Sequence, residues 1–146
     1  RTVTGVQTCA LPIFPTGCLI VDTHRVRRSD SPVLGRAYNQ IESLLDPTAH
    51  AEMLAIQQAA EALGDWRLTD TVLYVTKEPC PMCAGAIIHA RIPVVVYGAP
   101  DPQRGGETVF NLLDSPHLNH RCEVLGGVLE DACRECLQGF FRGRRD

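Results

Sequence analysis

Pro79-Cys80-Pro81-Met82-Cys83 and His50-Ala51-Glu52 are the two stretches around which the chain is organised. The first offers two thiols three residues apart, and the second offers an imidazole and a carboxylate. Cysteine sulfur and histidine nitrogen are typical zinc ligands, and a catalytic zinc site keeps three protein ligands and one open position for water. His50, Cys80 and Cys83 therefore form a candidate zinc site, and Glu52 remains as an acid that need not be a ligand.

Helix geometry explains how these side chains can meet at one ion. Cys80 and Cys83 lie three residues apart at an expected helix start, so they are about one turn apart on neighbouring faces. The partial positive charge at that helix end favours thiolate over thiol. His50 and Glu52 lie in the first turn of another expected helix, where side chains lean back toward the helix N-terminus. Glu52 can then transfer a proton between a zinc-activated water and a leaving nitrogen.

Outward from these stretches, short apolar runs alternate with amphipathic segments. We expect strands at residues 17–22, 33–38, 71–76, 93–98 and 123–125. We expect helices at residues 47–63, from about 80 to 90 and from Leu129 onward, with a short helical turn at 109–113. This alternation predicts an α/β sandwich around a central sheet of about five strands.

Two of the expected helices have specific start, stop and core predictions. Asp46 is a candidate cap with Pro47 at the first helical position, and Gly64 ends that helix. Its expected buried stripe consists of Met53, Ile56, Ala60 and Leu63. The expected stripe of the last helix consists of Leu129, Ala132, Cys133, Cys136, Leu137 and Phe140.

Composition narrows the class of protein. The chain has 146 residues, 45% of them hydrophobic, which suits one domain with a substantial core. No apolar run approaches the ~20 residues of a membrane helix. The net charge of −3 argues against indiscriminate nucleic-acid binding, so any such contact needs a local basic patch. The odd count of seven cysteines, two of them in a metal-type pair, indicates a reducing compartment and predicts a cytoplasmic protein.

The first residues stand apart from the rest. Residues 3–13 resemble the translation of a common sequencing-adapter oligonucleotide, so we interpret residues 1–13 as an artefact and residues 14–146 as the domain that carries the zinc-type motifs. A native extension is the alternative. The stretch is not a signal peptide, because its apolar part is too short and no small-residue cleavage site follows it.

Each candidate has an ordinary structural alternative. His50 alone could be a capping or buried histidine, and Glu52 alone a solvated helix carboxylate. The pair Cys80 and Cys83 could be half of a structural zinc site, which four protein ligands would close. Cys133 and Cys136 are the only second pair that could close it, and their place on an apolar helix stripe favours core packing. Cys18 and Cys122 are also predicted to be core residues.

From about Phe14 to its end, the chain resembles the bacterial tRNA-specific adenosine deaminases of the cytidine deaminase-like superfamily. The zinc motifs alone place the superfamily, and the later stretches favour the tRNA enzymes. The stretches that carry the resemblance are residues 46–52, 73–76, 78–87, 96–99, 111–113, 118–121 and 140–142. The resemblance implies a three-layer α/β/α sandwich with a mixed sheet, and formation of inosine from adenosine at the wobble position of a tRNA anticodon.

The resemblance also implies residue roles and partners. It gives His50, Cys80 and Cys83 as ligands of one Zn²⁺ per chain, and Glu52 as the proton shuttle. It implies that the following four residues contact the substrate: Asn39, Asp101, Phe141 and Arg142. The expected partners are a tRNA anticodon stem-loop and a second copy of the chain, with no membrane. The chain departs from the family pattern at Pro100 and Gln103, where basic residues are common.

Two rival functions remain open. A guanine or free-nucleoside deaminase would share the zinc motifs. A non-catalytic zinc-binding scaffold or deaminase partner subunit belongs to a different class. Glu52 argues against the second rival, because inactive partner subunits typically lack that acid.

Overall fold

The computed structural model describes the backbone of residues 16–26 and 32–143, so the artefact predicted at residues 1–13 lies outside the described residues. The elements run in the order β1 (Gly17–Asp22), α2 (Thr23–Val26), β2 (Val33–Tyr38), α3 (Ala51–Leu63), β3 (Thr71–Lys77), α4 (Pro81–His89), β4 (Val94–Ala99), β5 (Glu123–Leu125) and α5 (Glu130–Gly143). Every predicted strand is present within one residue of its predicted ends. Helix α2 was not predicted. The helical turn predicted at 109–113 is not formed, and the chain makes turns there instead.

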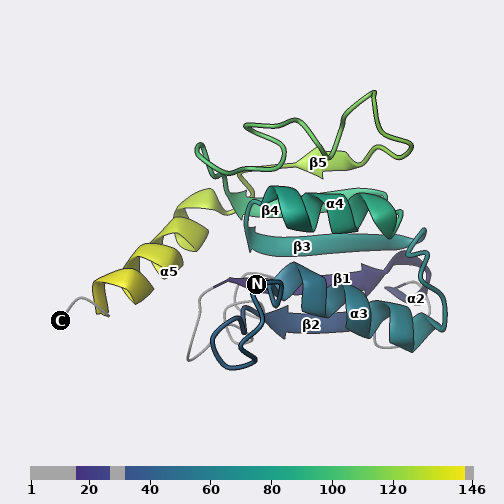
Figure 1. Cartoon of the computed structure of the whole chain (residues 1–146), viewed down its shortest axis with the longest axis horizontal. Helices are drawn as coiled ribbons and strands as arrows, with labels where there is room; N and C mark the ends of the chain where they lie inside the picture. The colour runs from purple at the N-terminus through teal and green to yellow at the C-terminus, as the bar shows by residue number, and fades with distance from the viewer. Residues whose placement is uncertain (1–15, 27–31, 144–146) are drawn as a thin grey trace.

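The five strands form one mixed sheet in the order β2-β1-β3-β4-β5 (Figure 1). β1 pairs antiparallel with both β2 and β3, whereas β3–β4 and β4–β5 are parallel. It follows that β2, β3 and β4 all run in the same direction. Their carboxyl ends, which lead into Asn39, Glu78 and Pro100, therefore meet at one edge of the sheet, where open α/β sheets bind ligands.

Helices α3 and α4 cover one face of this sheet (Figure 1). The strand register places Ile20, Leu73 and Val95 side by side on that face, and all three are fully buried. Because strand side chains alternate, Gly98 faces the opposite side, where a Cβ would overlap Cys133 of α5. Helices thus lie on both faces, which confirms the predicted α/β/α sandwich with a mixed five-stranded sheet.

The predicted start of α3 is wrong by four residues. Asp46 does not cap a helix. Its Oδ1 instead accepts hydrogen bonds from the Thr48 backbone N–H at 2.8 Å and from the Thr48 hydroxyl at 2.7 Å. This closed turn uses the polar groups that a helix start would need, and the helix begins at Ala51 with His50 as its extended N-cap residue. The predicted end is confirmed, since Gly64 caps the helix with a φ of 66°.

The predicted buried stripe of α3 is only partly right, because Met53, Ile56 and Ala60 are half-buried, with Ile56 and Ala60 packed against the core. Its buried residues are Ala51, Glu52, Ala55 and Ala59, whereas Leu63 is exposed. The reason is a close approach between helix and sheet. A Cβ on Gly35 of β2 would overlap the Ala55 carbonyl oxygen of α3, so only small side chains fit along this contact.

The last helix is less buried than its apolar stripe predicts. Cys133 is buried and Cys136 and Leu137 are half-buried, but Leu129 and Ala132 are exposed. The side chain of Phe140 lies outside the described residues. Leu129 precedes the helix with a φ of 51°, so it does not share the face that Cys133 presents to β4.

None of the helices in the described part of the chain has the length and apolar character of a membrane span.

The contact between Gly35 and Ala55 gives a direct test of the α3–sheet packing. We expect Gly35→Ala to lower the free energy of unfolding by about 1–3 kcal/mol, because the added methyl group meets backbone that cannot move aside. Gly139→Ala in α5 is the matched control, since its Cβ would meet nothing within 4 Å. Urea unfolding of both variants measures the difference, and equal stabilities would contradict the close packing.

Candidate metal and active site

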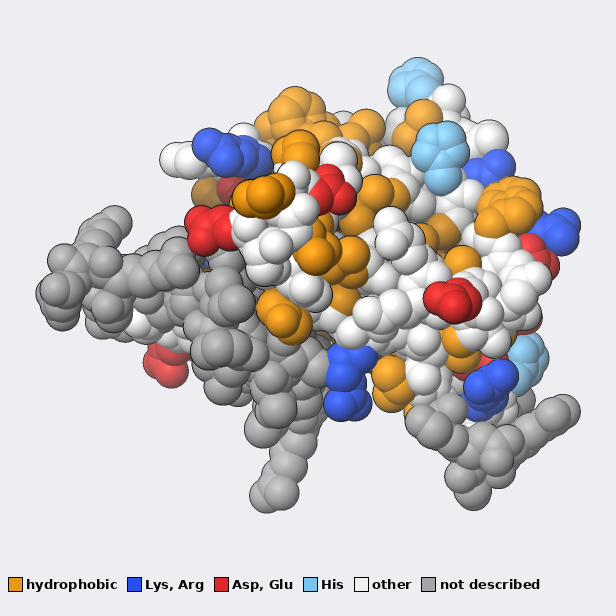
Figure 2. Space-filling model, turned by 60° about the horizontal axis from the view of Figure 1, so that its bottom comes forward, with side chains coloured by type: hydrophobic (Ala, Val, Ile, Leu, Met, Phe, Trp, Pro, Cys, Tyr) orange, Lys and Arg blue, Asp and Glu red, His pale blue; other side chains and the backbone are white. Residues whose placement is uncertain are grey.

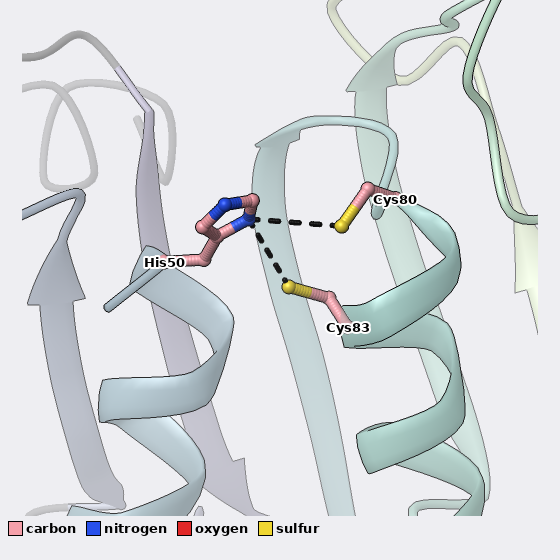
Figure 3. A group of neighbouring side chains, drawn as sticks. All are labelled: His50, Cys80 and Cys83. Atoms are coloured by element: carbon pink, nitrogen blue, oxygen red, sulfur yellow. Dashed lines mark hydrogen bonds between the residues drawn. The ribbon is translucent and has the colours of Figure 1, made fainter. Parts of the chain in front are cut away.

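The three predicted metal ligands lie together at the N-terminal ends of α3 and α4 (Figure 3). His50 is the N-cap residue of α3. Cys80 is the N-cap residue of α4, followed by Pro81, which suits the first turn of a helix, and Cys83 lies within that turn. The turn closed by Asp46 keeps His50 outside the helix, so its ring can extend toward the two sulfurs.

The ligand atoms have the separation that a tetrahedral metal site needs. The His50 Nδ1 atom lies 3.7 Å from the Cys80 sulfur and 3.5 Å from the Cys83 sulfur. Zinc bonds of about 2.3 Å to sulfur and 2.0–2.1 Å to nitrogen at tetrahedral angles place the two ligand atoms about 3.6 Å apart. His50, Cys80 and Cys83 could therefore hold a metal ion with little movement.

Among the described residues this is the one group of three or more His, Cys, Asp or Glu side chains found close enough to bind a metal. Cys133 and Cys136 are not part of it, although both are free thiols. A structural site closed by that second pair is therefore not formed. Cys18 and Cys122 are buried, as predicted for core residues.

The two thiols have different affinities for their protons. Hydrogen bonds from Cys83 and His50 stabilise the Cys80 thiolate, and the pKa of Cys80 falls to about 4. The pKa of Cys83 is raised, because its thiol donates to Cys80 and is buried beside Glu52. The hydrogen bond with Cys80 in turn raises the pKa of His50. One sulfur is thus already a thiolate, which is the form that binds metals.

Glu52 lies directly beside the ligand group. Its side chain is 3% exposed, and its Oε2 atom is 3.5 Å from the Cys83 sulfur. Burial raises the pKa of this carboxyl group, because a charged carboxylate is poorly solvated there. A carboxyl group with a raised pKa, next to a metal site, suits the uptake and release of a proton.

A cavity of about 180 Å³ opens above the ligand group. His50, Glu52 and Cys80 contribute to its wall, and so do Asn39 and Asp101, two of the four residues predicted to contact a substrate. The Oδ1 atom of Asn39 accepts a hydrogen bond from the Ile41 N–H at 3.1 Å. Phe141 and Arg142 belong to the last turns of α5, and their side chains lie outside the described residues.

The same cavity has five wall residues that the sequence analysis did not predict as site residues. These are Thr16, Lys77, Glu78, Arg104 and Leu137. Asp101 forms an ion pair with Lys77 at 3.2 Å, which joins the end of β3 to the loop after β4. Two of these residues could have been predicted from their position in the sequence, because Lys77 and Glu78 directly precede the Cys80 motif at the carboxyl end of a strand.

The chain is similar in sequence and in structure to known deaminases. The sequence profile of the MafB19-like deaminases matches residues 18–145. A tRNA-specific adenosine deaminase of Bacillus subtilis (strain 168) is 50% identical over 114 residues, which cover 77% of this chain and 71% of that protein. The guanine deaminase structure from Bacillus subtilis is 30% identical, with a TM-score of 0.55, and covers 98% of this chain and 86% of its own.

A solved structure from work on A-to-I editing by deaminases acting at the wobble position of transfer RNA is more similar. It has 41% sequence identity and a TM-score of 0.75, and the match covers 85% of this chain and 86% of that chain. Identity to these adenosine deaminases therefore exceeds identity to the guanine deaminase.

Metal analysis tests the ligand group. We expect Cys80→Ser to lower bound metal from about one ion per chain to a small fraction of that, because a thiolate ligand is lost. Cys136→Ser is the control, since this half-buried thiol lies outside the group and should leave the metal content unchanged. Elemental analysis of purified protein gives both values, and loss of metal in the control alone would refute the assignment.

Proposed function

The chain belongs to the tRNA-specific adenosine deaminase family and matches the MafB19-like deaminases, and we propose that it converts adenosine to inosine at the wobble position of a tRNA anticodon. The observation that carries this proposal is the placement of a buried acid, Glu52, beside three converging candidate metal ligands, two of which, His50 and Cys80, line the same cavity as Glu52. The reaction replaces the amino group at C6 of adenine with oxygen from water and releases ammonia.

We further propose that the metal is zinc, one ion per chain, held by His50, Cys80 and Cys83. The nitrogen and sulfur donors and their separations support zinc over metals that prefer oxygen ligands. Bound zinc would supply Lewis acidity, which lowers the pKa of a water molecule in an open coordination position to about 7.

In this proposal Glu52 moves the proton that the reaction requires. Its carboxylate accepts a proton from water as the C6–O bond forms. In a second step a proton is donated to the amino nitrogen, which leaves as ammonia when the C6–N bond breaks, and the other water proton ends on the ring nitrogen N1. The buried position supports this role, since a raised pKa lets the side chain hold the proton between the two transfers.

The cavity supports recognition of a nucleoside lifted out of its RNA strand. Asn39, at the end of β2, and Asp101, after β4, stand in the wall around the metal ligands, where we propose that they bind the flipped nucleoside and a neighbouring nucleotide. Leu137 brings α5 into the same wall. This placement is compatible with the proposed RNA contacts of Phe141 and Arg142 further along that helix.

RNA binding would be local. On the described surface visible in Figure 2, lysine and arginine side chains stand apart from one another among acidic and hydrophobic groups. Together with the net charge of −3, this supports contact with an anticodon loop at the cavity mouth over general affinity for RNA. We also propose a homodimer in the cytoplasm, as the family resemblance and the cysteine content imply.

An anticodon stem-loop with a wobble adenosine is the direct test of substrate class. We expect the full chain to form inosine in this RNA, and to leave guanine and free adenosine unchanged under the same conditions. Nucleoside analysis by mass spectrometry measures all three substrates. Turnover of guanine without turnover of the stem-loop would instead establish the guanine deaminase alternative.

The role of Glu52 is tested by a single substitution. We expect Glu52→Ala to reduce inosine formation by at least about 10²–10⁴-fold, the usual contribution of a general acid–base group, while the metal content stays near one per chain. Glu61→Ala, on the exposed surface of the same helix, should retain wild-type activity. An active Glu52→Ala variant would show that the proton follows another route.

A further inference from the structure

Glu78 is a buried carboxylate that the proposed chemistry does not use. It follows β3 directly and stands two residues before Cys80, and it is 3% exposed although it contributes to the cavity wall. A buried charge of this kind is costly unless its hydrogen-bonding capacity is filled. Its partners therefore indicate what it is for.

All the hydrogen bonds found for the Glu78 carboxylate come from the loop that follows β4. Its Oε1 atom accepts from the Asp101 N–H at 3.0 Å and from the Thr108 hydroxyl at 2.6 Å. Its Oε2 atom accepts from the Glu107 N–H at 3.0 Å and the Thr108 N–H at 2.8 Å. One side chain thus holds both ends of the segment 101–108.

Two glycines let this loop approach the Glu78 side chain and the start of α4 closely. The Gly106 N–H donates to the Pro79 carbonyl at 2.8 Å, and the Gly105 N–H donates to the Asp101 carbonyl at 2.9 Å. A Cβ on Gly105 would overlap the Glu78 carboxylate, and one on Gly106 would lie 2.7 Å from Ala84 of α4. The loop is therefore fitted against the segment that carries Cys80.

Two charged residues on this loop stand in the cavity wall. The Asp101 carboxylate pairs with Lys77, and its Oδ1 atom accepts the Arg104 N–H at 3.0 Å. Both Asp101 and Arg104 line the cavity. Their positions depend on where the Asp101 backbone is held, and that backbone is bonded to Glu78.

We propose that Glu78 is a positioning residue for substrate: it fixes loop 101–108 to the metal-bearing segment so that Asp101 and Arg104 face the nucleotides around the reacting adenosine. This inference rests on the proposed function. Glu78 does not touch the reacting atoms and acts through the loop. A carboxylate suits the task because three backbone N–H groups and a hydroxyl converge on its two oxygens.

Glu78→Gln separates this role from a merely structural one. The glutamine amide can satisfy the donors at one oxygen, but its NH₂ group must then face a backbone N–H, so one end of the loop is released. We expect KM for the stem-loop to rise about tenfold, while kcat changes less than about twofold and metal content stays at the wild-type value.

Hydrogen exchange gives a readout independent of activity. In Glu78→Gln we expect faster exchange of the amides in segment 101–108, with unchanged exchange in α4. Glu107→Gln is the matched control, because this neighbouring carboxylate accepts only the Asp114 N–H at 3.2 Å among the hydrogen bonds found for it. It should leave both KM and loop exchange unchanged.

Thr108→Val provides a milder change if Glu78→Gln folds poorly. It removes the 2.6 Å hydroxyl bond and leaves the carboxylate in place, so it should shift KM and loop exchange in the same direction by a smaller factor. Unchanged KM and exchange in both variants, or a fall in kcat and metal content with KM unaltered, would overturn the proposal. If the unsubstituted chain forms no inosine in the stem-loop, the proposed function is refuted. Faster loop exchange in Glu78→Gln would in that case still support the contact between Glu78 and the loop.

Discussion

The site depends on bringing two helix N-termini to the same edge of the sheet. Three strands running in one direction set that edge, because β1 lies antiparallel between β2 and β3 and the β3–β4 pair is parallel. α4 is the crossover between the parallel strands, and α3 reaches its place by packing its alanine face against Gly35. Neither helix alone holds three ligands. The metal group exists only because this packing brings His50 to within 3.7 Å of two sulfurs.

The electrostatics of the group follow from its compactness. Two thiols and a carboxyl group lie close together, two of them almost fully buried, so all three cannot be charged without a cation. The pKa of Cys80 is lowered to about 4 and the pKa of Cys83 is raised, so Cys83 is the sulfur that keeps its proton more strongly. A divalent cation would replace that proton and neutralise the sulfurs. The proton capacity of Glu52 would then be available for catalysis.

Local patterns in the sequence were enough to predict the strands, the ends of α4 and the convergence of His50, Cys80 and Cys83, because each rests on a short apolar run or a fixed spacing. The errors arose where a tertiary contact decided the outcome. Asp46 has the residue type of a helix cap but closes a turn with Thr48. The bulkier residues of α3 were expected to be buried, yet its close contact with β2 admits only alanine. Arg104 and Leu137 reach the cavity from distant segments, and no sequence spacing relates them to Cys80.

The cavity combines two kinds of support. The candidate metal ligands and Glu52 stand at the starts of packed helices, whereas Asn39, Asp101 and Arg104 stand on the loops that follow strands. Loops can change while a sheet and its helices stay the same, so one deaminase fold can accept different bases. The 30% identity to a guanine deaminase structure with a similar fold is consistent with this division. A loop that selects a substrate must still be held at a fixed distance from the metal. The buried Glu78 carboxylate provides that link, because it is bonded to the loop and precedes the ligand Cys80 by two residues.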